Sequence, residues 1–471
     1  MDVNIKFQRL LEDVLNRIDR EELVPLAREL VRIPSVYRPE EPDGNEARVA
    51  GYVADYLERV GFEVKTEEVA PGRPNVWAVW EGDCLGKTLL FEAHTDVVTE
   101  GSAEDWNYPP FGAVRDRDRL YGRGACDTKG NLAAAVVAVR AIRDSGVPFP
   151  GSLILCHPVD EEGMMAGIKA FIERGHTEGV DAAVICEPEE NQLCITQKGA
   201  LRIEVTVRGR MAHGAMPKSG INPVTRAARF VVAVEDLERE EIERHGEDPY
   251  LGSPSLTPTI LMGPDCGEPQ INVVPASTYV ALDIRTLPDQ SHKELVERLE
   301  DIIANLASED PAFDATLDVI EERPPTETPK DEPLVRAMAK AYNHLTGEEP
   351  TYNGVPGATD GTFLHALVGI PIVTTGAGDR EIPHHADEWV DEEETSHHLQ
   401  TLRRNGDVLR LRRGNPCLIT APCSTFQARP PSSSGPAAAS ARPAHKESRP
   451  SVHAWYAPTC TETPRIPRPQ R

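Results

Sequence analysis

Several features that would assign the 471-residue chain to common protein classes are absent from its sequence. No apolar run approaches the roughly 20 residues that a helix needs to cross a bilayer, so we expect no membrane span. Positive charge is scarce, because 50 Lys and Arg face 76 Asp and Glu, a net charge of −26. This balance argues against nucleic acid and anionic membranes as partners, since both need a basic surface.

The cysteines also exclude two classes of small domain. There are nine, an odd number with no Cys-x-x-Cys pair, so neither a disulfide framework nor a zinc finger is indicated. Residues 1–20 lack the basic and apolar regions of a secretory signal. Together these absences predict a reduced, cytoplasmic location.

The charge is unevenly distributed. Residues 396–471 contain 12 Lys and Arg, 3 Asp and Glu and 11 Pro, whereas residues 1–395 carry a net charge of −35. A segment of that composition buries too little apolar surface to offset its ordering entropy, so we expect disorder over 396–471. It is compatible with a basic regulatory tail or with a non-native C-terminus read in a shifted frame. The excess of Arg (39) over Lys (11) fits GC-rich coding and favours the second interpretation.

The first 395 residues alternate apolar runs with amphipathic helical patterns. Helical spacing is expected in 5–18, 23–31, 48–60, 132–142 and 334–346, and strands in 76–79, 88–93, 152–157, 181–186 and 371–374. Runs that are apolar on both faces, with helices between them, predict an α/β domain with a mostly parallel buried sheet flanked by helices. We assign residues 1–197 and 319–395 to this domain.

The residues between these two parts have a different pattern. Residues 201–208 and 278–285 alternate between apolar and polar side chains, as half-exposed antiparallel strands do, and amphipathic helices are expected at 222–239 and 292–306. This predicts an inserted α+β domain over residues 198–318.

Histidines and acids follow several of the expected strands directly. His94 and Asp96 come after one apolar run, Glu161 and Glu162 after another, and Glu187 after a third. In open α/β sheets the site lies beyond the carboxyl ends of the strands. Imidazole and carboxylate ligands without thiolates suit Zn²⁺, or Mn²⁺ and Co²⁺, and several carboxylates permit two ions that share a bridging ligand. Each residue also has a simpler interpretation, such as a helix cap for Asp127 or a solvated turn for 160–163.

Taken together, five sequence blocks resemble the metal-site blocks of the aminoacylase / acetylornithine deacetylase / succinyl-diaminopimelate desuccinylase family. The blocks are FEAHTDVV (91–98), YGRGACDTKGNLAAAV (121–136), VDEEG (159–163), ICEPE (185–189) and HHADEWV (384–390). Members of that family are co-catalytic zinc metallohydrolases and include dipeptidases and glutamate carboxypeptidases. The resemblance spans roughly residues 10–395 and implies that the inserted domain is a lid or dimerisation domain.

The resemblance implies a role for each matching residue. His94, Asp127, Glu162, Glu187 and His384 would bind two divalent ions, with Asp127 as the bridge. His385 remains the alternative to His384. Asp96 would orient the imidazole of His94, and Glu161 would be the general base. In the inserted domain, His213 would reach the site of the partner subunit and stabilise the oxyanion. The implied substrate contacts are Asn272, Arg285, Gly357 and Thr359.

The resemblance therefore implies a metal-dependent amide hydrolase that acts on a small N-acyl amino acid and forms a homodimer through the lid domain. A dipeptidase or carboxypeptidase of the same family is the alternative within that class. The second function class is a non-catalytic descendant that binds metal or ligand as a regulator. Retention of all the metal-site positions and of Glu161 favours the enzyme. The acyl group, the amino acid and the native metal are left open by the sequence.

Overall fold

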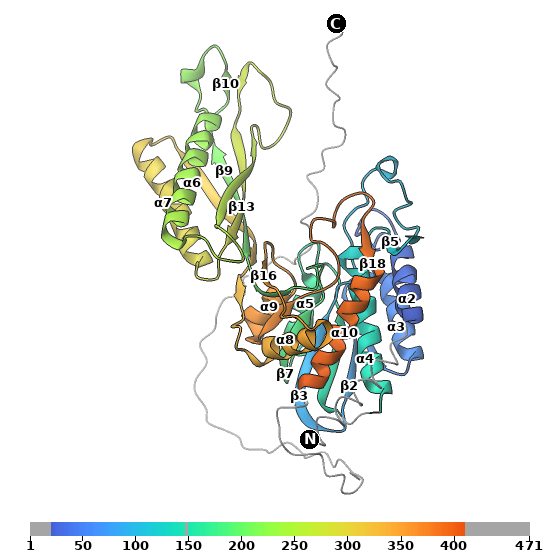
Figure 1. Ribbon diagram of the computed structural model, residues 1–471. Coiled ribbons are helices and arrows are strands. Elements are labelled where there is room, and N and C mark those ends of the chain that lie inside the picture. The colour runs from blue at the N-terminus through green and yellow to red at the C-terminus, as the bar shows by residue number, and fades with distance from the viewer. Residues whose placement is uncertain (1–19, 147–148, 410–471) are drawn as a thin grey trace, which may run out of the picture. The chain divides into compact units, whose positions relative to one another are not determined.

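The apolar runs of the sequence form the centre of a nine-stranded sheet in the computed structural model, which describes residues 20–146 and 149–409 (Figure 1). The described residues belong to one unit, Met1–Cys417, and the second unit, Leu418–Arg471, lies outside them. The helix expected at residues 5–18 also lies outside the described residues.

The sheet has the strand order β1-β2-β6-β3-β7-β17-β8-β15, with β16 paired to β8. The central neighbours β6, β3, β7 and β17 are parallel, and the pairs β1–β2, β2–β6, β17–β8 and β8–β15 are antiparallel. The strands are β1 (Glu63–Ala70), β2 (Arg73–Glu81), β3 (Cys84–Glu92), β6 (Pro150–His157), β7 (Val180–Ile185), β8 (Leu193–Gln197), β15 (Thr326–Glu327), β16 (Tyr352–Val355) and β17 (Ile372–Thr374). The expected α/β architecture is confirmed.

Helices cover both faces of this sheet (Figure 1). Leu89 and Phe91 of β3 pack into one apolar cluster with residues of α2, α3, α4, α8 and α10, and Leu90 packs into another with residues of α5. This follows from the two-residue period of a strand. The helices are α2 (Arg20–Arg32), α3 (Ala47–Arg59), α4 (Gly130–Asp144), α5 (Ala166–Glu173), α8 (Pro333–Thr346), α9 (Gly361–Phe363) and α10 (Glu392–Leu409). None of the described helices is long and apolar enough to span a membrane.

Helix α10 corrects one expectation. Its residues from Ser396 to Leu409 lie in the segment that was expected to be disordered. Leu399 and Leu402 are fully buried in the cluster that includes α4 and α8. Packing of an apolar face, rather than intrinsic helical preference, stabilises most helices in proteins, so the weak helical pattern of the sequence was a poor guide. Residues 410–471 lie outside the described residues.

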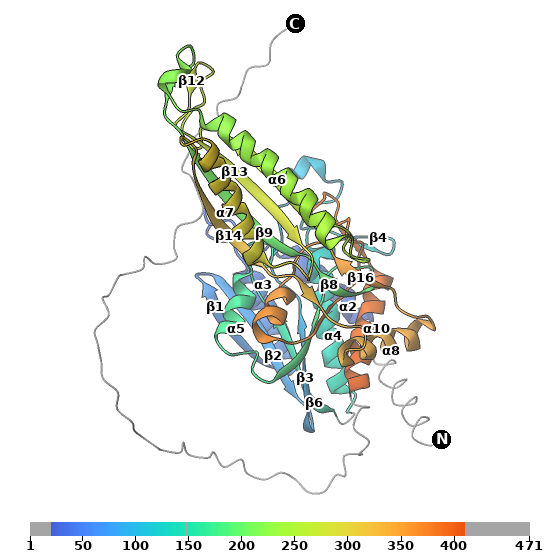
Figure 2. The same cartoon turned by 90° about the vertical axis from the view of Figure 1, so that its left-hand side faces the viewer.

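The inserted module consists of a four-stranded antiparallel sheet with two helices on one face (Figure 2). Its strand order is β11-β13-β9-β14, and alternate residues of β9 pack against the helices. The elements are β9 (Gly199–Arg208), β10 (Ala212–His213), α6 (Pro223–His245), β11 (Ser255–Met262), β12 (Val273–Val274), β13 (Ser277–Thr286), α7 (His292–Glu309) and β14 (Asp314–Arg323). The expected boundary at residue 318 falls inside β14, where a bulge between Val319 and Glu321 interrupts the alternating pattern.

A small third sheet completes the main domain. Its order is β18-β5-β4, with β4 (Val114–Asp116), β5 (Arg119–Tyr121) and β18 (Trp389–Asp391). Strand β18 directly follows the HHADE sequence, so its pairing with β5 anchors that sequence to the chain just before Asp127.

Candidate active site

Four strands of the large sheet end at the same level. Glu92, the last residue of β3, pairs with Cys156 of β6 and with Ile185 of β7, and Ile185 pairs with Thr374 of β17. All four strands are parallel, so the segments that follow them leave the sheet at one edge. These segments contain His94, Asp96, Glu161, Glu162, Glu187 and His384, whereas Asp127 comes from the segment between β5 and α4.

His94 lies fully buried at this edge, directly after β3. Its Nε2 is 3.0 Å from Oδ1 of Asp127 and 3.6 Å from Oε1 of Glu187. Its Nδ1 is 3.0 Å from the backbone oxygen of Asp96 and 3.5 Å from that residue's Oδ1. A partner on Nδ1 fixes the orientation of the ring and directs Nε2 at the two carboxylates.

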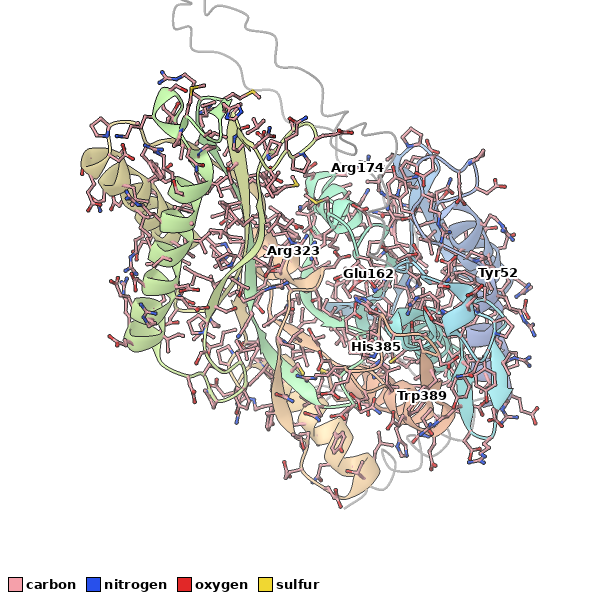
Figure 3. The ribbon with its side chains drawn as sticks, turned by 90° about the horizontal axis from the view of Figure 1, so that it is seen from above. Tyr52, Glu162, Arg174, Arg323, His385 and Trp389 are labelled. Atoms are coloured by element: carbon pink, nitrogen blue, oxygen red, sulfur yellow. The ribbon has the colours of Figure 1, made fainter. Side chains whose placement is uncertain are left out.

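A second group shares Asp127 with the first. Nε2 of His384 is 3.0 Å from Oε1 of Glu162 and 3.5 Å from Oδ2 of Asp127. His384 comes from the segment after β17, and its backbone has a positive φ of 68°. His385 is exposed, and its own N–H bonds to the carbonyl of Ile382 at 3.4 Å. Figure 3 labels Glu162 and His385 in a view from above.

The two groups have the composition and spacing of metal sites. One ligand atom from each of His94, Asp127 and Glu187 lies within 4.8 Å of the others, and the same holds for Asp127, Glu162 and His384. Oε1 of Glu187 is buried and has no hydrogen-bond partner among the described residues. Such an oxygen is costly to bury unless it binds a cation or a donor. The residues therefore fit two divalent ions with Asp127 between them.

The pKa values show how strongly the groups attract positive charge. Hydrogen bonds to Asp127 and Glu162 raise the pKa of His384 to about 10. Burial acts to raise the pKa of Asp127, but the hydrogen bonds from His384 and His94 outweigh it and leave that pKa below its usual range. Burial raises the pKa of Glu187 well above normal. Carboxylates this concentrated need cationic partners to remain ionised.

Asp96 organises the site in two ways. Besides lying against His94, its two carboxylate oxygens accept the backbone N–H groups of Glu161 (3.1 Å) and Glu162 (3.0 Å). One side chain therefore fixes both a candidate ligand and the turn that carries the candidate base. Glu161 itself is 8% exposed, and burial, with further contributions from Glu162 and Asp127, raises its pKa well above the usual range. A buried carboxyl group with a raised pKa is suited to general acid–base catalysis.

One functional group was missed by sequence reasoning. Glu388 accepts the N–H groups of Cys126 (2.9 Å) and Asp127 (3.0 Å) through Oε1, and Arg123 donates to its Oε2 at 2.5 Å. Arg123 and Glu388 are both at most 2% exposed. Glu388 lies in the HHADE sequence, four residues after His384, which was the available signal. It ties the backbone of the shared ligand to the segment that carries His384.

Two residues of the inserted module lie together at the small two-stranded sheet formed by β10 and β12. His213 and Asn272 are exposed, and Gly214 donates its N–H to the backbone oxygen of Asn272 at 2.6 Å. Nδ1 of His213 accepts the N–H of Ala215 at 3.0 Å. Among the described residues, no hydrogen bond or ion pair joins either residue to the two ligand groups.

The other expected substrate contacts are partly engaged by protein groups. Arg285 donates to both carboxylate oxygens of Asp283, at 2.6 and 3.1 Å, and its Nη1 is 3.9 Å from the position that a Cβ on Gly357 would occupy. Thr359 is buried, and both its N–H and its hydroxyl donate to Oε1 of Gln197. Arg285 and Gly357 are thus neighbours, whereas the hydroxyl of Thr359 already has a protein acceptor.

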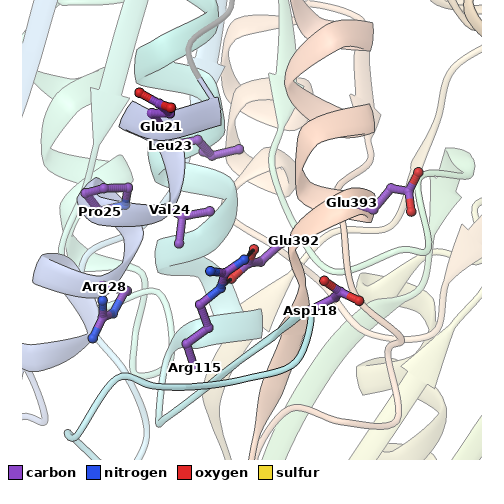
Figure 4. A pocket seen from close by; sticks show the side chains of 9 residues that line it. All are labelled: Glu21, Leu23, Val24, Pro25, Arg28, Arg115, Asp118, Glu392 and Glu393. Carbon is purple, nitrogen blue, oxygen red and sulfur yellow. Dashed lines mark hydrogen bonds and ion pairs between the residues drawn. The ribbon is translucent and has the colours of Figure 1, made fainter.

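A surface pocket of about 550 Å³ lies elsewhere on the main domain (Figure 4). It is formed by α2, by residues of the β4–β5 hairpin and by the start of α10, and none of the candidate site residues lines it. Arg115 and Glu392 in its wall form a bidentate ion pair at 2.5 and 2.7 Å. Because Arg115 and Glu392 pair with each other and no candidate site residue lines this pocket, we do not include it in the candidate site.

Comparisons with known proteins identify the family of the chain. The model of peptidase family M20/M25/M40 matches residues 90–405. The chain is 31% identical over 383 residues to a succinyl-diaminopimelate desuccinylase of Methylobacterium radiotolerans, covering 78% of this chain and 91% of the relative. It is 27% identical over 420 residues to an N-formyl-4-amino-5-aminomethyl-2-methylpyrimidine deformylase of Halalkalibacterium halodurans, covering 83% and 96%.

Solved structures share the fold. An M20 family metallo-carboxypeptidase from Sulfolobus solfataricus superimposes with a TM-score of 0.68 at 20% identity, covering 82% of this chain and 99% of that one. The YXEP protein of Bacillus subtilis, described as a dinuclear metal binding peptidase, gives 0.63 at 17% identity and covers 83% and 98%. The family match extends over more than half of the chain and includes every candidate metal ligand. The chain therefore belongs to peptidase family M20/M25/M40 and is a metal-dependent hydrolase of amide bonds.

Proposed function

We propose that the protein releases an amino acid from an N-acyl amino acid at a two-metal site in which Asp127 is shared. His94 and Glu187 complete one group of ligands, and Glu162 and His384 complete the other. The observation that carries this proposal is that two sets of three ligand atoms, each within 4.8 Å, meet at one carboxylate beside the buried Glu161. His384 is preferred to His385 because its Nε2 faces Glu162 and Asp127.

Divalent ions held by these ligands would supply a Lewis acid that polarises the substrate carbonyl and lowers the pKa of water. Glu161 takes a proton from the attacking water molecule as the water oxygen bonds to the amide carbon. It then delivers the proton to the leaving nitrogen as the C–N bond breaks. Glu161 suits both steps because it is buried beside Glu162, which acts as a ligand, while Asp96 holds the backbone of both residues in place.

The carboxylate of the substrate is assigned to Arg285 and the loop at Gly357. Arginine recognises a planar carboxylate through two parallel hydrogen bonds, and Arg285 already forms such a pair with Asp283. A substrate carboxylate would compete with Asp283 for the guanidinium. Thr359 contributes to binding of the substrate carboxylate through Gln197 and the loop backbone, because its own hydroxyl already donates to Gln197.

His213 and Asn272 are assigned to the site of a second subunit in a homodimer. Their exposure at the two-stranded β10–β12 sheet supports a role outside their own main domain. Strand β11 is an edge of the module's sheet, and its Ile260, Leu261 and Met262 are each 47–49% exposed. An unpaired edge with apolar side chains is suited to pairing with a second copy. Size measurement by light scattering tests this assembly, and a monomer at micromolar concentration would contradict it.

A substrate panel tests the activity. The full chain is loaded with Zn²⁺, Co²⁺ or Mn²⁺ and assayed with N-acetyl and N-succinyl amino acids, an N-formyl amine and dipeptides. We expect N-acyl amino acids to be cleaved with the highest kcat/KM, with Zn²⁺ as the bound metal after purification without added metal. Preference for dipeptides would favour the peptidase alternative, which the similar solved structures keep open. No turnover of any substrate would favour a non-catalytic metal-binding regulator. A cytoplasmic location is part of the proposal, and cell fractionation tests it.

A further inference from the structure

The turn 160–163 carries both the candidate base and a candidate ligand, and its first supports come from the main domain. Asp96 accepts the N–H groups of Glu161 and Glu162. The carboxylate of Asp160 in turn accepts the N–H groups of Met164 and Ala166 and pairs with Arg73 at 2.8 Å. The turn is therefore held by charged groups rather than by regular secondary structure.

A third support comes from the inserted module. Nη2 of Arg323 donates to the backbone oxygen of Gly163 at 2.5 Å. Gly163 ends the turn, and a Cβ there would lie 2.5 Å from Oδ1 of Asp160, so only glycine fits without a shift. Arg323 is 7% exposed although it is a charged residue at the end of a strand. Figure 3 labels Arg323 and Glu162, which come from the two sides of this contact.

A β-bulge in β14 directs Arg323 toward this contact. Before the bulge Leu317 pairs with Val205, whose side chain lies in the apolar core of the module. After the bulge Glu321 pairs with Arg202, on the opposite face of the sheet. One extra residue moves every following side chain to the other face. Without it, Arg323 would point toward the module's own helices.

The guanidinium of Arg323 is also held inside the module. Its Nε donates to Oε1 of Glu321 at 2.6 Å, and Arg202 donates to the other carboxylate oxygen at 2.5 Å. Glu321 is 4% exposed. The guanidinium is thus fixed by an acid of the module, and its remaining edge reaches the turn of the main domain.

We propose that Arg323 is a positioning residue through which the inserted module holds the turn that carries Glu161 and Glu162. The inference rests on the proposed function for its effect on turnover, but the effect on the turn itself does not depend on any substrate. A carboxylate that takes a proton must stay within hydrogen-bond reach of it, and a displacement of about 1 Å can cost about 100-fold in rate. The module therefore contributes to catalysis through this contact as well as through any residue that touches the substrate.

Hydrogen–deuterium exchange on the full chain loaded with Zn²⁺ tests the contact directly. We expect Arg323→Met to accelerate exchange of the backbone amides in residues 161–166 by about 10-fold or more. It should also lower kcat on an N-acetyl amino acid by about 10- to 100-fold, with KM changed less than about 3-fold and two metal ions still bound. Arg323→Lys should recover part of both losses, since it keeps one donor and the charge. The matched control is Arg208→Met, an exposed arginine on the neighbouring strand β9 that contacts Asp314 and Thr316 of β14.

Unchanged exchange and unchanged kcat in Arg323→Met would overturn the proposal, as would equal effects in Arg208→Met. If Arg323→Met does not fold, Glu321→Gln serves instead, because it frees the guanidinium without removing it. Unchanged exchange of residues 161–166 in a folded Glu321→Gln would also count against the proposal. If the wild type cleaves none of the substrates while Arg323→Met still loosens the turn, the proposed function fails and the positioning role stands.

Discussion

Helix α10 contains a buried histidine that makes its stability sensitive to acid. His398 is fully buried, and neither of its ring nitrogens has a hydrogen-bond partner among the described residues. Burial lowers the pKa of His398 to about 3. Its neighbours Leu399 and Leu402 lie in the main apolar cluster, so His398 occupies a helix that packs tightly against the rest of the domain. Replacing it with Leu keeps a similar volume and removes the unpaired polar atoms.

The sign and size of the pH effect follow from the two pKa values. In the unfolded chain the imidazole has a pKa near 6.5, so between pH 6.5 and about 3 the unfolded state binds one more proton than the folded state at this position. The free energy of unfolding therefore falls as the pH falls through this window, by about 1.4 kcal/mol per pH unit. Between pH 7 and pH 5 the loss is about 2 kcal/mol. At any pH, a buried polar group without a hydrogen-bond partner also lowers the free energy of unfolding by about 1–3 kcal/mol.

Urea unfolding of wild type, His398→Leu and His397→Leu at pH 7 and pH 5 measures both effects. We expect His398→Leu to be more stable than wild type by about 1–3 kcal/mol at pH 7 and by about 2 kcal/mol more than that at pH 5. His397 is the matched control because it is the adjacent histidine of the same helix and is exposed. The same difference between His398→Leu and wild type at both pH values would refute the reasoning.

Three further predictions concern the active site. Glu161→Ala should lower kcat by about 100- to 10,000-fold while leaving two bound metal ions, and activity near that of wild type would exclude Glu161 as the base. Asp127→Ala should lose most of both ions because Asp127 belongs to both ligand groups, whereas Glu187→Ala should retain about one ion. Metal analysis after dialysis measures the metal content of both variants. Equal metal content in the two variants would contradict the shared role of Asp127. Glu388→Gln should weaken metal binding by about 10- to 100-fold, because Glu388 accepts the backbone N–H of Asp127 and pairs with the buried Arg123. Titration with Co²⁺ measures the affinity. Unchanged affinity would show that metal binding does not depend on these contacts of Glu388.

Much of the fold followed from periodicity in the sequence. The Ala- and Val-rich pattern at 132–142 predicted α4, and the short apolar runs at 88–93 and 181–186 predicted β3 and β7. These segments are buried on both sides, so their apolar character is strong. Strand β1 was not predicted, because it lies at the edge of the sheet and its residues are mostly polar or half-exposed. The weak pattern after Ser396 likewise concealed the helical part of α10.

The candidate ligands were predictable because each lies next to a strand or helix end in a distinctive sequence. Spacing alone left His384 and His385 open, and the backbone turn with positive φ at His384 brings its Nε2 to Glu162. Thr359 was expected to contact substrate, and the structure shows that its hydroxyl donates to Gln197, which is distant in the sequence. Residues that act through other residues, such as Glu388 and Arg323, have no signature of their own in a single sequence.

The sequence by itself determined which chemistry the chain can perform, because the types and order of its histidines and carboxylates are fixed by the covalent chain. It also determined the alternation of strands and helices, because local periodicity reports which face of each element is buried. Only the tertiary structure decided which of these groups meet. The level ends of four parallel strands bring together residues such as Glu162 and His384, which are 222 positions apart, and a single bulge in β14 decides where Arg323 points. Contacts of this kind depend on strand register and packing across the whole domain, which no short stretch of sequence encodes.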